Sequence, residues 1–128
     1  MLTLVLLAML SSAPSGSSET NVVLGTWEGE SKCTVPDSPC HDEHVILEFK
    51  RDGETKLSLD AYKIVNGEKQ FMGTLTCQLP KDYEISCTFA EGKRLNDWVY
   101  KFDDKKMTGT LYMDKERTVY RRINVAKR

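Results

Sequence analysis

Four cysteines carry the most specific chemistry in this chain of 128 residues: Cys33, Cys40, Cys77 and Cys87. An even number of cysteines in a short chain is typical of an exported domain that is held by disulfides. The first two flank a turn-rich loop, and the other two lie on either side of a turn that contains Pro80. Because each spacing suits one short loop, we predict two local disulfides, Cys33 to Cys40 and Cys77 to Cys87.

A run of titratable residues, His41, Asp42, Glu43 and His44, follows directly after Cys40. With the cysteines it offers ligand types that zinc binds, but the paired Cys-x-x-Cys spacing of zinc sites is missing. Side chains alternate between the two faces of a strand, so at most two of the four could meet at one ligand. We expect a solvated strand start and no metal site.

No constellation of catalytic residues stands out elsewhere. We find no Ser, His and Asp set, no glycine-rich phosphate loop and no close pair of carboxylates. These are the arrangements that nucleophilic, phosphoryl-transfer and acid-base chemistry need. The sequence therefore predicts a protein that is not an enzyme and has no catalytic residues.

The composition limits the class of partner. The chain has 18 basic and 19 acidic residues, with 40% hydrophobic and 29% charged residues. This balance creates no field that would concentrate nucleic acid or anionic lipid. After the N-terminal segment, no apolar stretch is long enough to span a bilayer. We expect one domain, no nucleic-acid partner and no membrane insertion.

The N-terminus differs from the rest of the chain. Residues 2–10 are almost purely apolar and are followed by small residues over 11–16. This order is typical of a secretory signal peptide, and it suits a processing site better than the alternative of a buried N-terminal helix. We predict a signal peptide over 1–15, a flexible segment over 16–21 and a β-barrel domain over 22–127. The protein would then be secreted or periplasmic.

From residue 21 onward, apolar and polar residues alternate and turn signals recur at short intervals. A period of two predicts β-strands with one buried face, and no segment shows a helical period. Most connections contain Gly, Asn, Asp or Pro, which tight hairpin turns favour. The pattern predicts eight strands, over residues 21–33, 43–51, 55–65, 69–79, 83–90, 94–103, 106–113 and 117–126.

Eight sequential strands must cover their apolar face and protect two sheet edges. Closing the sheet into a barrel achieves both. A two-layer sandwich would also bury the face, but it usually needs longer crossing connections. We predict an all-β fold, an eight-stranded antiparallel up-and-down barrel with two local disulfides.

A Gly-Thr-Trp-Glu-Gly run at residues 25–29 opens the first predicted strand. A Gly-x-Trp on strand one of such a meander resembles the calycin group, which includes lipocalins and fatty-acid-binding proteins. Segment 31–44 also resembles small exported bacterial proteins of unassigned function. In the calycin group the tryptophan plugs one end of the barrel, and an arginine on the last strand packs on its ring. The resemblance implies this cation-π contact between Trp27 and an inward-facing Arg121.

The resemblance brings no cofactor. The haem-binding nitrobindins share the Gly-x-Trp-x-Gly pattern but take a proximal histidine late in the chain, and this sequence has no histidine after His44. Fatty-acid-binding proteins hold the ligand carboxylate with an Arg-x-Tyr on the last strand. Here Arg117 and Tyr120 are three residues apart and do not share a face of a strand. We expect no cofactor.

Inward positions of the middle strands combine bulk with a few hydroxyl groups, as small-molecule pockets generally do. We predict a binding protein for a small hydrophobic ligand, held in a cavity at the barrel end opposite Trp27. The glycines at inward positions allow two alternatives: they leave an open cavity, or they let neighbouring bulky side chains fill the interior. The predicted ligand-binding residues are Phe71, Leu75, Tyr83, Trp98 and Tyr100.

The alternative is a protein partner. The chain is also similar to small periplasmic inhibitors of bacterial metalloproteases, which are calycin-like barrels that act through a projecting N-terminal segment. Segment 16–21 would be that tail. The volume of the barrel interior discriminates between the two functions, because a filled barrel carries no ligand.

Overall fold

The computed structural model describes residues 17–89, 96–113 and 116–128, so the predicted signal peptide, 1–15, lies outside the described residues. The described chain forms a short helix followed by strands. The elements are α1 (Ser17–Val23), β1 (Gly25–Cys33), β2 (Glu43–Asp52), β3 (Lys56–Val65), β4 (Glu68–Gln78), β5 (Glu84–Phe89), β6 (Asn96–Phe102), β7 (Lys106–Met113) and β8 (Thr118–Lys127).

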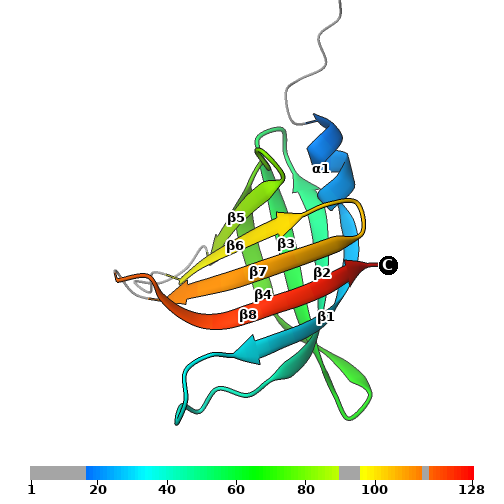
Figure 1. Cartoon of the computed structure of the whole chain (residues 1–128). Coiled ribbons are helices and arrows are strands. Elements are labelled where there is room, and N and C mark those ends of the chain that lie inside the picture. Colours follow the sequence, from blue (N-terminus) through cyan, green and yellow to red (C-terminus); the bar gives the residue numbers. More distant parts are fainter. Residues whose placement is uncertain (1–16, 90–95, 114–115) are drawn as a thin grey trace, which may run out of the picture.

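The strands close into a barrel in chain order. Each strand pairs antiparallel with the next, and β8 pairs with β1 to complete the circle, as Figure 1 shows. The predicted eight-stranded antiparallel barrel is therefore confirmed. The strand bounds agree closely with the sequence pattern, except that β1 begins at Gly25 and not at residue 21.

Helix α1 corrects the prediction of a flexible segment over 16–21. Thr20 and Val23 are buried against the barrel, and the indole Nε1 of Trp27 donates a hydrogen bond of 2.9 Å to the carbonyl oxygen of Val23. A helix of 7 residues is too short to show a clear periodicity and is marginal in isolation. Contacts with the barrel hold this helix, and a local sequence pattern does not reveal them.

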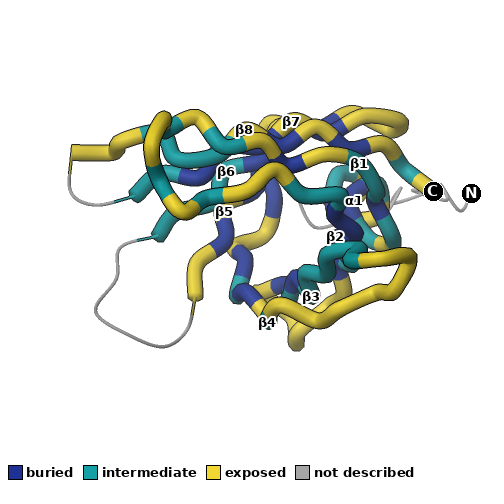
Figure 2. The backbone as a smooth tube through the Cα atoms, turned by 90° about the horizontal axis from the view of Figure 1, so that it is seen from below, coloured by how far each residue is buried: buried dark blue, intermediate teal, exposed yellow. Residues whose placement is uncertain are grey.

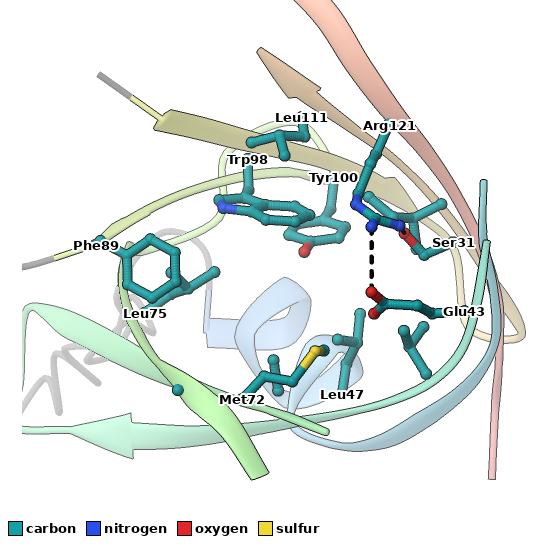
Figure 3. A pocket seen from close by; sticks show the side chains of 14 residues that line it. Ser31, Glu43, Leu47, Met72, Leu75, Phe89, Trp98, Tyr100, Leu111 and Arg121 are labelled. Atoms are coloured by element: carbon teal, nitrogen blue, oxygen red, sulfur yellow. Dashed lines mark hydrogen bonds and ion pairs between the residues drawn. The ribbon is translucent and has the colours of Figure 1, made fainter. Parts of the chain in front are cut away.

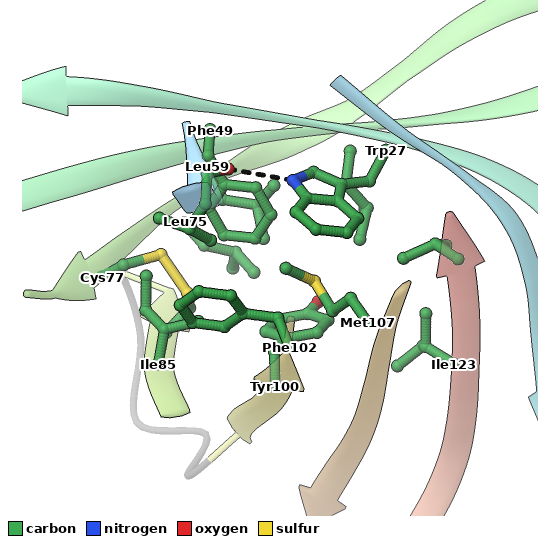
Figure 4. Packing of buried hydrophobic residues seen from close by; sticks show 14 of the residues in the cluster. Trp27, Phe49, Leu59, Leu75, Cys77, Ile85, Tyr100, Phe102, Met107 and Ile123 are labelled. Atoms are coloured by element: carbon green, nitrogen blue, oxygen red, sulfur yellow. Dashed lines mark hydrogen bonds between the residues drawn. A yellow bond between two sulfur atoms is a disulfide. The ribbon is translucent and has the colours of Figure 1, made fainter. Parts of the chain in front are cut away.

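The barrel end next to α1, where β1 begins and β8 ends, is called the closed end below. Trp27 is fully buried there, and inward side chains of the other strands surround it, as Figure 4 shows. Burial of apolar surface stabilises the fold by about 25 cal/mol per Å². The buried core that contains Trp27 also includes Phe49, Leu57, Leu59, Phe102, Met107 and Val125.

The predicted contact between Trp27 and Arg121 is wrong, although Trp27 is the buried centre of the closed end. In the strand register Trp27 lies opposite Lys127, whereas Arg121 lies opposite Cys33 at the other end of β1. The Nζ atom of Lys127 is 4.7 Å from the centroid of the Trp27 ring. Arg121 does point inward, but the alternation of side chains fixes a face and not a position along the strand.

Both predicted disulfides, Cys33–Cys40 and Cys77–Cys87, are present. Cys77 and Cys87 are register partners on β4 and β5, and both are buried. Disulfides are typical of an oxidising compartment outside the cytoplasm. Among the described residues, no helix is long and apolar enough to cross a membrane.

The seam between β4 and β5 is short. Strand β4 pairs with β3 along its length, but its pairing with β5 covers only Leu75 to Cys77. The first part of β4, residues 68–72, is exposed, as Figure 2 shows. The sheet is therefore less tightly joined at the end of the barrel where β1 ends and β8 begins, which is called the open end below.

Candidate functional site: a cavity at the open end

A cavity of about 180 Å³ lies inside the barrel, in the half away from Trp27. Every strand contributes to its lining, and Figure 3 shows the side chains directed into it. These residues are the inward positions that follow the closed-end core along each strand. The aliphatic part of the wall comes from Val45, Leu47, Ala61, Leu75, Leu111 and Ile123.

Trp98 and Tyr100 form an aromatic wall of the cavity. They are two residues apart on β6, so both side chains point into the barrel. Their rings are nearly parallel, with an interplanar angle of 7° and centroids 6.5 Å apart. Gly109 lies opposite Tyr100 on β7, and a Cβ atom at this glycine would come within 2.5 Å of Cδ1 of Tyr100. Glycine at this position therefore lets the tyrosine ring lie against the backbone of β7.

A polar group of three residues, Arg121, Glu43 and Ser31, borders the other side of the cavity. Nη2 of Arg121 donates a hydrogen bond of 3.1 Å to Oε1 of Glu43, and Nη1 donates one of 3.2 Å to Oγ of Ser31. Ser31 and Glu43 are register partners on β1 and β2, and Arg121 is on β8, the other neighbour of β1. The side chains of Arg121 and Glu43 are 12% and 21% exposed. The ion pair is therefore largely removed from water.

The aromatic wall adds one further donor to the cavity, the hydroxyl group of Tyr100. Figure 3 shows the hydroxyl group of Tyr100 directed toward the cavity. Burial raises the pKa of Tyr100, so the phenol stays neutral and can donate a hydrogen bond. In the described part of the chain the Nε1 atom of Trp98 is buried without a hydrogen-bond partner. Such an unsatisfied buried donor costs roughly 1 to 3 kcal/mol.

Three of the five predicted ligand-binding residues line the cavity, and two do not. Leu75, Trp98 and Tyr100 lie in its wall. Phe71 and Tyr83 are 61% and 46% exposed and point elsewhere. Each of the two departures has a local backbone cause.

Phe71 is displaced by a β-bulge. Ala61 on β3 pairs with Gly73, but the next residue, Tyr62, pairs with Phe71, so Met72 is the extra residue in β4. A bulge reverses the phase of the strand beyond it. Phe71 therefore lies on the outer face, where its ring centroid is 5.5 Å from that of Tyr62, and Met72 joins the cavity lining in its place.

Tyr83 lies in a tight turn at the closed end. Asp82 and Tyr83 both have positive φ angles, 54° and 58°, as a hairpin turn of type I′ requires. Backbone hydrogen bonds between Lys81 and Glu84 close this turn. The ring of Tyr83 packs at 5.5 Å from that of Phe102, far along the barrel from the cavity.

Sequence reasoning did not assign Ser31, Glu43, Met72 or Phe89 to the pocket. Glu43 shares the inward phase of Val45 on β2, and a charged residue at an inward position was the available signal. Phe89 also shares an inward phase, at the end of β5. Met72 carried no such signal, because only the bulge brings it to the cavity.

The run His41 to His44 forms no metal-binding group among the described residues. Glu43 points inward, whereas His44 lies on the outer face between Glu28 and Glu30. Its Nε2 atom is 2.6 Å from Oε2 of Glu28, and its Nδ1 atom is 2.9 Å from Oε1 of Glu30. The hydrogen bonds to Glu28 and Glu30 raise the pKa of His44, and the bond to His44 lowers the pKa of Glu28. This group links β1 to β2 on the outer face of the barrel.

Comparison with known proteins adds information on the fold. A scan against protein-family models and a search of curated proteins found no match for the sequence. Among solved structures, the barrel is similar to Rv2717c from M. tuberculosis, with a TM-score of 0.62 and 10% sequence identity over 91% of this chain and 99% of that chain. At this level of identity the likeness establishes the shared barrel fold alone.

Proposed function

We propose that this protein is an exported, lipocalin-like binding protein that holds one small, mostly apolar molecule inside the barrel. The observation that supports the proposal is the cavity of about 180 Å³, with aliphatic and aromatic walls and a polar group on one side. A few convergent polar groups in an apolar pocket are the usual composition of small-molecule sites. No catalytic step is part of the proposal.

The volume sets the size of the ligand. Pockets for drug-sized molecules measure about 300–1,000 Å³, which is larger than this cavity. A dry apolar cavity of about 150 Å³ in another protein binds benzene. The ligand that fits is therefore a single-ring compound or a short aliphatic chain, and a long fatty acid or a retinoid would not fit inside.

Export belongs to the same proposal. The two disulfides and the predicted signal peptide support a periplasmic or secreted location. A carrier for small apolar compounds is useful where such compounds must pass through water. A barrel whose interior is partly empty meets this need without a conformational change.

The alternative function, a protein-contact module that acts through an N-terminal tail, has less support. Most of the segment that would form the tail lies in α1. Thr20 and Val23 anchor this helix in the closed end. The backbone N–H of Tyr83 also donates a hydrogen bond to the Glu19 carboxylate of the helix. A segment held at these points does not project from the barrel.

Thermal denaturation with a panel of indole, benzyl alcohol, acetophenone, 1-hexanol and decanoate tests the proposal. A ligand at a hundred times its dissociation constant stabilises the fold by about 2.7 kcal/mol. We expect concentration-dependent stabilisation by single-ring and short-chain compounds and none by decanoate. If no small compound shifts the transition, the carrier function is wrong.

A pair of matched variants locates the binding site. Ala61→Phe introduces a ring into the cavity, whereas Ala126→Phe adds the same ring on the outer face of β8, where Ala126 is exposed. We expect the first variant to lose ligand-induced stabilisation and the second to keep it. Retained binding by Ala61→Phe would show that the ligand lies outside this cavity.

A further inference from the structure

The charge balance of the polar group beside the cavity indicates which ligands the pocket accepts. Arg121 offers a positive charge at the cavity wall, but Glu43 already pairs with it at 3.1 Å. From this pairing we propose that the pocket selects neutral ligands that carry a hydrogen-bond acceptor, and that it discriminates against carboxylates. This inference rests on the proposed carrier function and specifies its ligand class.

The geometry holds the ion pair in place. Glu43 and Ser31 lie directly opposite each other on paired strands, and Arg121 reaches both from the third strand. Ser31 is buried, and both charged side chains are mostly shielded from water. Three strands of a closed barrel therefore fix the positions of the three side chains. A ligand cannot draw Arg121 away without leaving Glu43 without its partner.

Electrostatics then disfavours an anionic ligand. A carboxylate that approaches Arg121 from the cavity also approaches Glu43, so attraction by the first is offset by repulsion from the second. The ligand carboxylate would still lose its hydration on entering an apolar cavity, and the free-energy cost of this desolvation is large for an ion. A neutral carbonyl, ether or hydroxyl oxygen has a much smaller desolvation penalty and meets no repulsion.

Available donors favour an acceptor on the ligand. A guanidinium has five N–H groups, and the bonds to Glu43 and Ser31 engage two of them in Arg121. The hydroxyl of Tyr100 faces the cavity. The stacked rings of Trp98 and Tyr100 give the cavity an aromatic wall. The ligand class is thus a small neutral compound, preferably with one aromatic ring and a carbonyl or hydroxyl oxygen.

Calorimetric titration with benzamide, acetophenone and benzoate at pH 7 tests the inference, because benzamide and benzoate have nearly the same shape and differ in charge. We expect wild-type protein to bind the two neutral compounds at least tenfold more tightly than benzoate. Glu43→Gln keeps the shape of the side chain and removes its charge, leaving Arg121 unneutralised. In this variant we expect the affinity for benzoate, relative to the affinity for the neutral compounds, to rise at least tenfold.

Glu84→Gln is the matched control, because it removes one carboxylate from the exposed surface of β5 and leaves the pocket intact. We expect this variant to keep the wild-type ratio, which separates a local effect from a change in net charge. Circular dichroism verifies folding, and the wild-type ratio decides the selectivity even if Glu43→Gln does not fold.

The outcomes distinguish the two proposals. Equal or tighter binding of benzoate by wild-type protein overturns the selectivity while the carrier function stands. An unchanged ratio in folded Glu43→Gln overturns the role of the ion pair. If none of the three compounds nor any other small compound binds, the carrier function is rejected and the selectivity falls with it.

Discussion

The two ends of the barrel are built from the same strands and the same alternation, yet one is filled and the other holds a cavity. On three of the strands, the bulk of the inward side chains falls from the closed end to the open end. Large residues interdigitate at the first end, whereas small ones leave space at the second. The change is seen from Trp27 to Ser31 on β1, from Leu59 to Ala61 on β3 and from Leu75 to Gly73 on β4.

The two ends also differ in the contacts that hold them together. At the closed end, α1 covers the core, and Lys127 donates hydrogen bonds to the backbone carbonyl oxygens of Val22 and Leu24. These bonds satisfy carbonyl groups at the C-terminal end of a helix, where cations are favourable. At the open end, β4 is not joined to β5 before Leu75, and the ion pair lies inside the barrel. The packed core and the helix that covers it therefore lie at one end of the barrel, and the cavity lies at the other.

The two tryptophans give the largest expected contrast between the ends. Trp27→Ala leaves a void in a packed core and removes the hydrogen bond to Val23, so we expect a loss of about 3 to 5 kcal/mol in the free energy of unfolding. Trp98→Ala removes a ring that already borders a cavity, and we expect a loss of about 1 to 2 kcal/mol. Urea denaturation measures both. Equal losses would contradict a stability concentrated at the closed end.

The two inward-facing cations provide the next contrast. Lys127→Met removes the contact with the Trp27 ring and the bonds to the end of α1, and we expect a loss of about 1 to 2 kcal/mol in the free energy of unfolding. The same substitution at Arg121 should leave the surroundings of Trp27 unchanged. The indole N–H signal of Trp27 in NMR spectra reads this difference directly. If only Arg121→Met shifts this signal, Trp27 contacts Arg121, as predicted from the sequence, and not Lys127.

The smallest expected effect is on the outer wall of the open end. The pKa of His44 is raised, so its stabilising contribution is fully present below the ordinary histidine value of 6.5 and is lost as pH rises through the folded-state value. The pKa of Glu28 is lowered, so its contribution is present above 4.5 and is lost as pH falls. We therefore expect the free energy of unfolding of wild-type protein to exceed that of His44→Gln more at pH 6 than at pH 9.

His41→Gln is the matched control for this measurement. His41 is exposed next to the Cys33–Cys40 disulfide, so its substitution removes a histidine without touching Glu28 or Glu30. Urea denaturation of all three proteins across the pH range provides the comparison. A pH-independent difference for His44→Gln would exclude the proposed ionic contribution of His44.

Local features of the sequence determined most of the barrel. Side chains of a strand alternate between two faces whatever the strand pairs with, so the inward phase of Trp98 and Tyr100 was readable from residue order. Turn residues located the ends of the strands, and the spacing of the cysteines gave both disulfides. The inward orientation of Arg121 was also predicted from the alternation, and only its predicted contact with Trp27 was wrong.

Tertiary structure alone decided the rest. The register between β1 and β8 placed Lys127, and not Arg121, beside Trp27. A bulge at Met72 reversed the phase of Phe71, and α1 formed because the end of the barrel buries Thr20 and Val23. Each of these depends on segments that are distant in sequence, whereas alternation depends on neighbours. The cavity has the same origin, because empty space is set by the combined volume of side chains that meet only when all eight strands have paired.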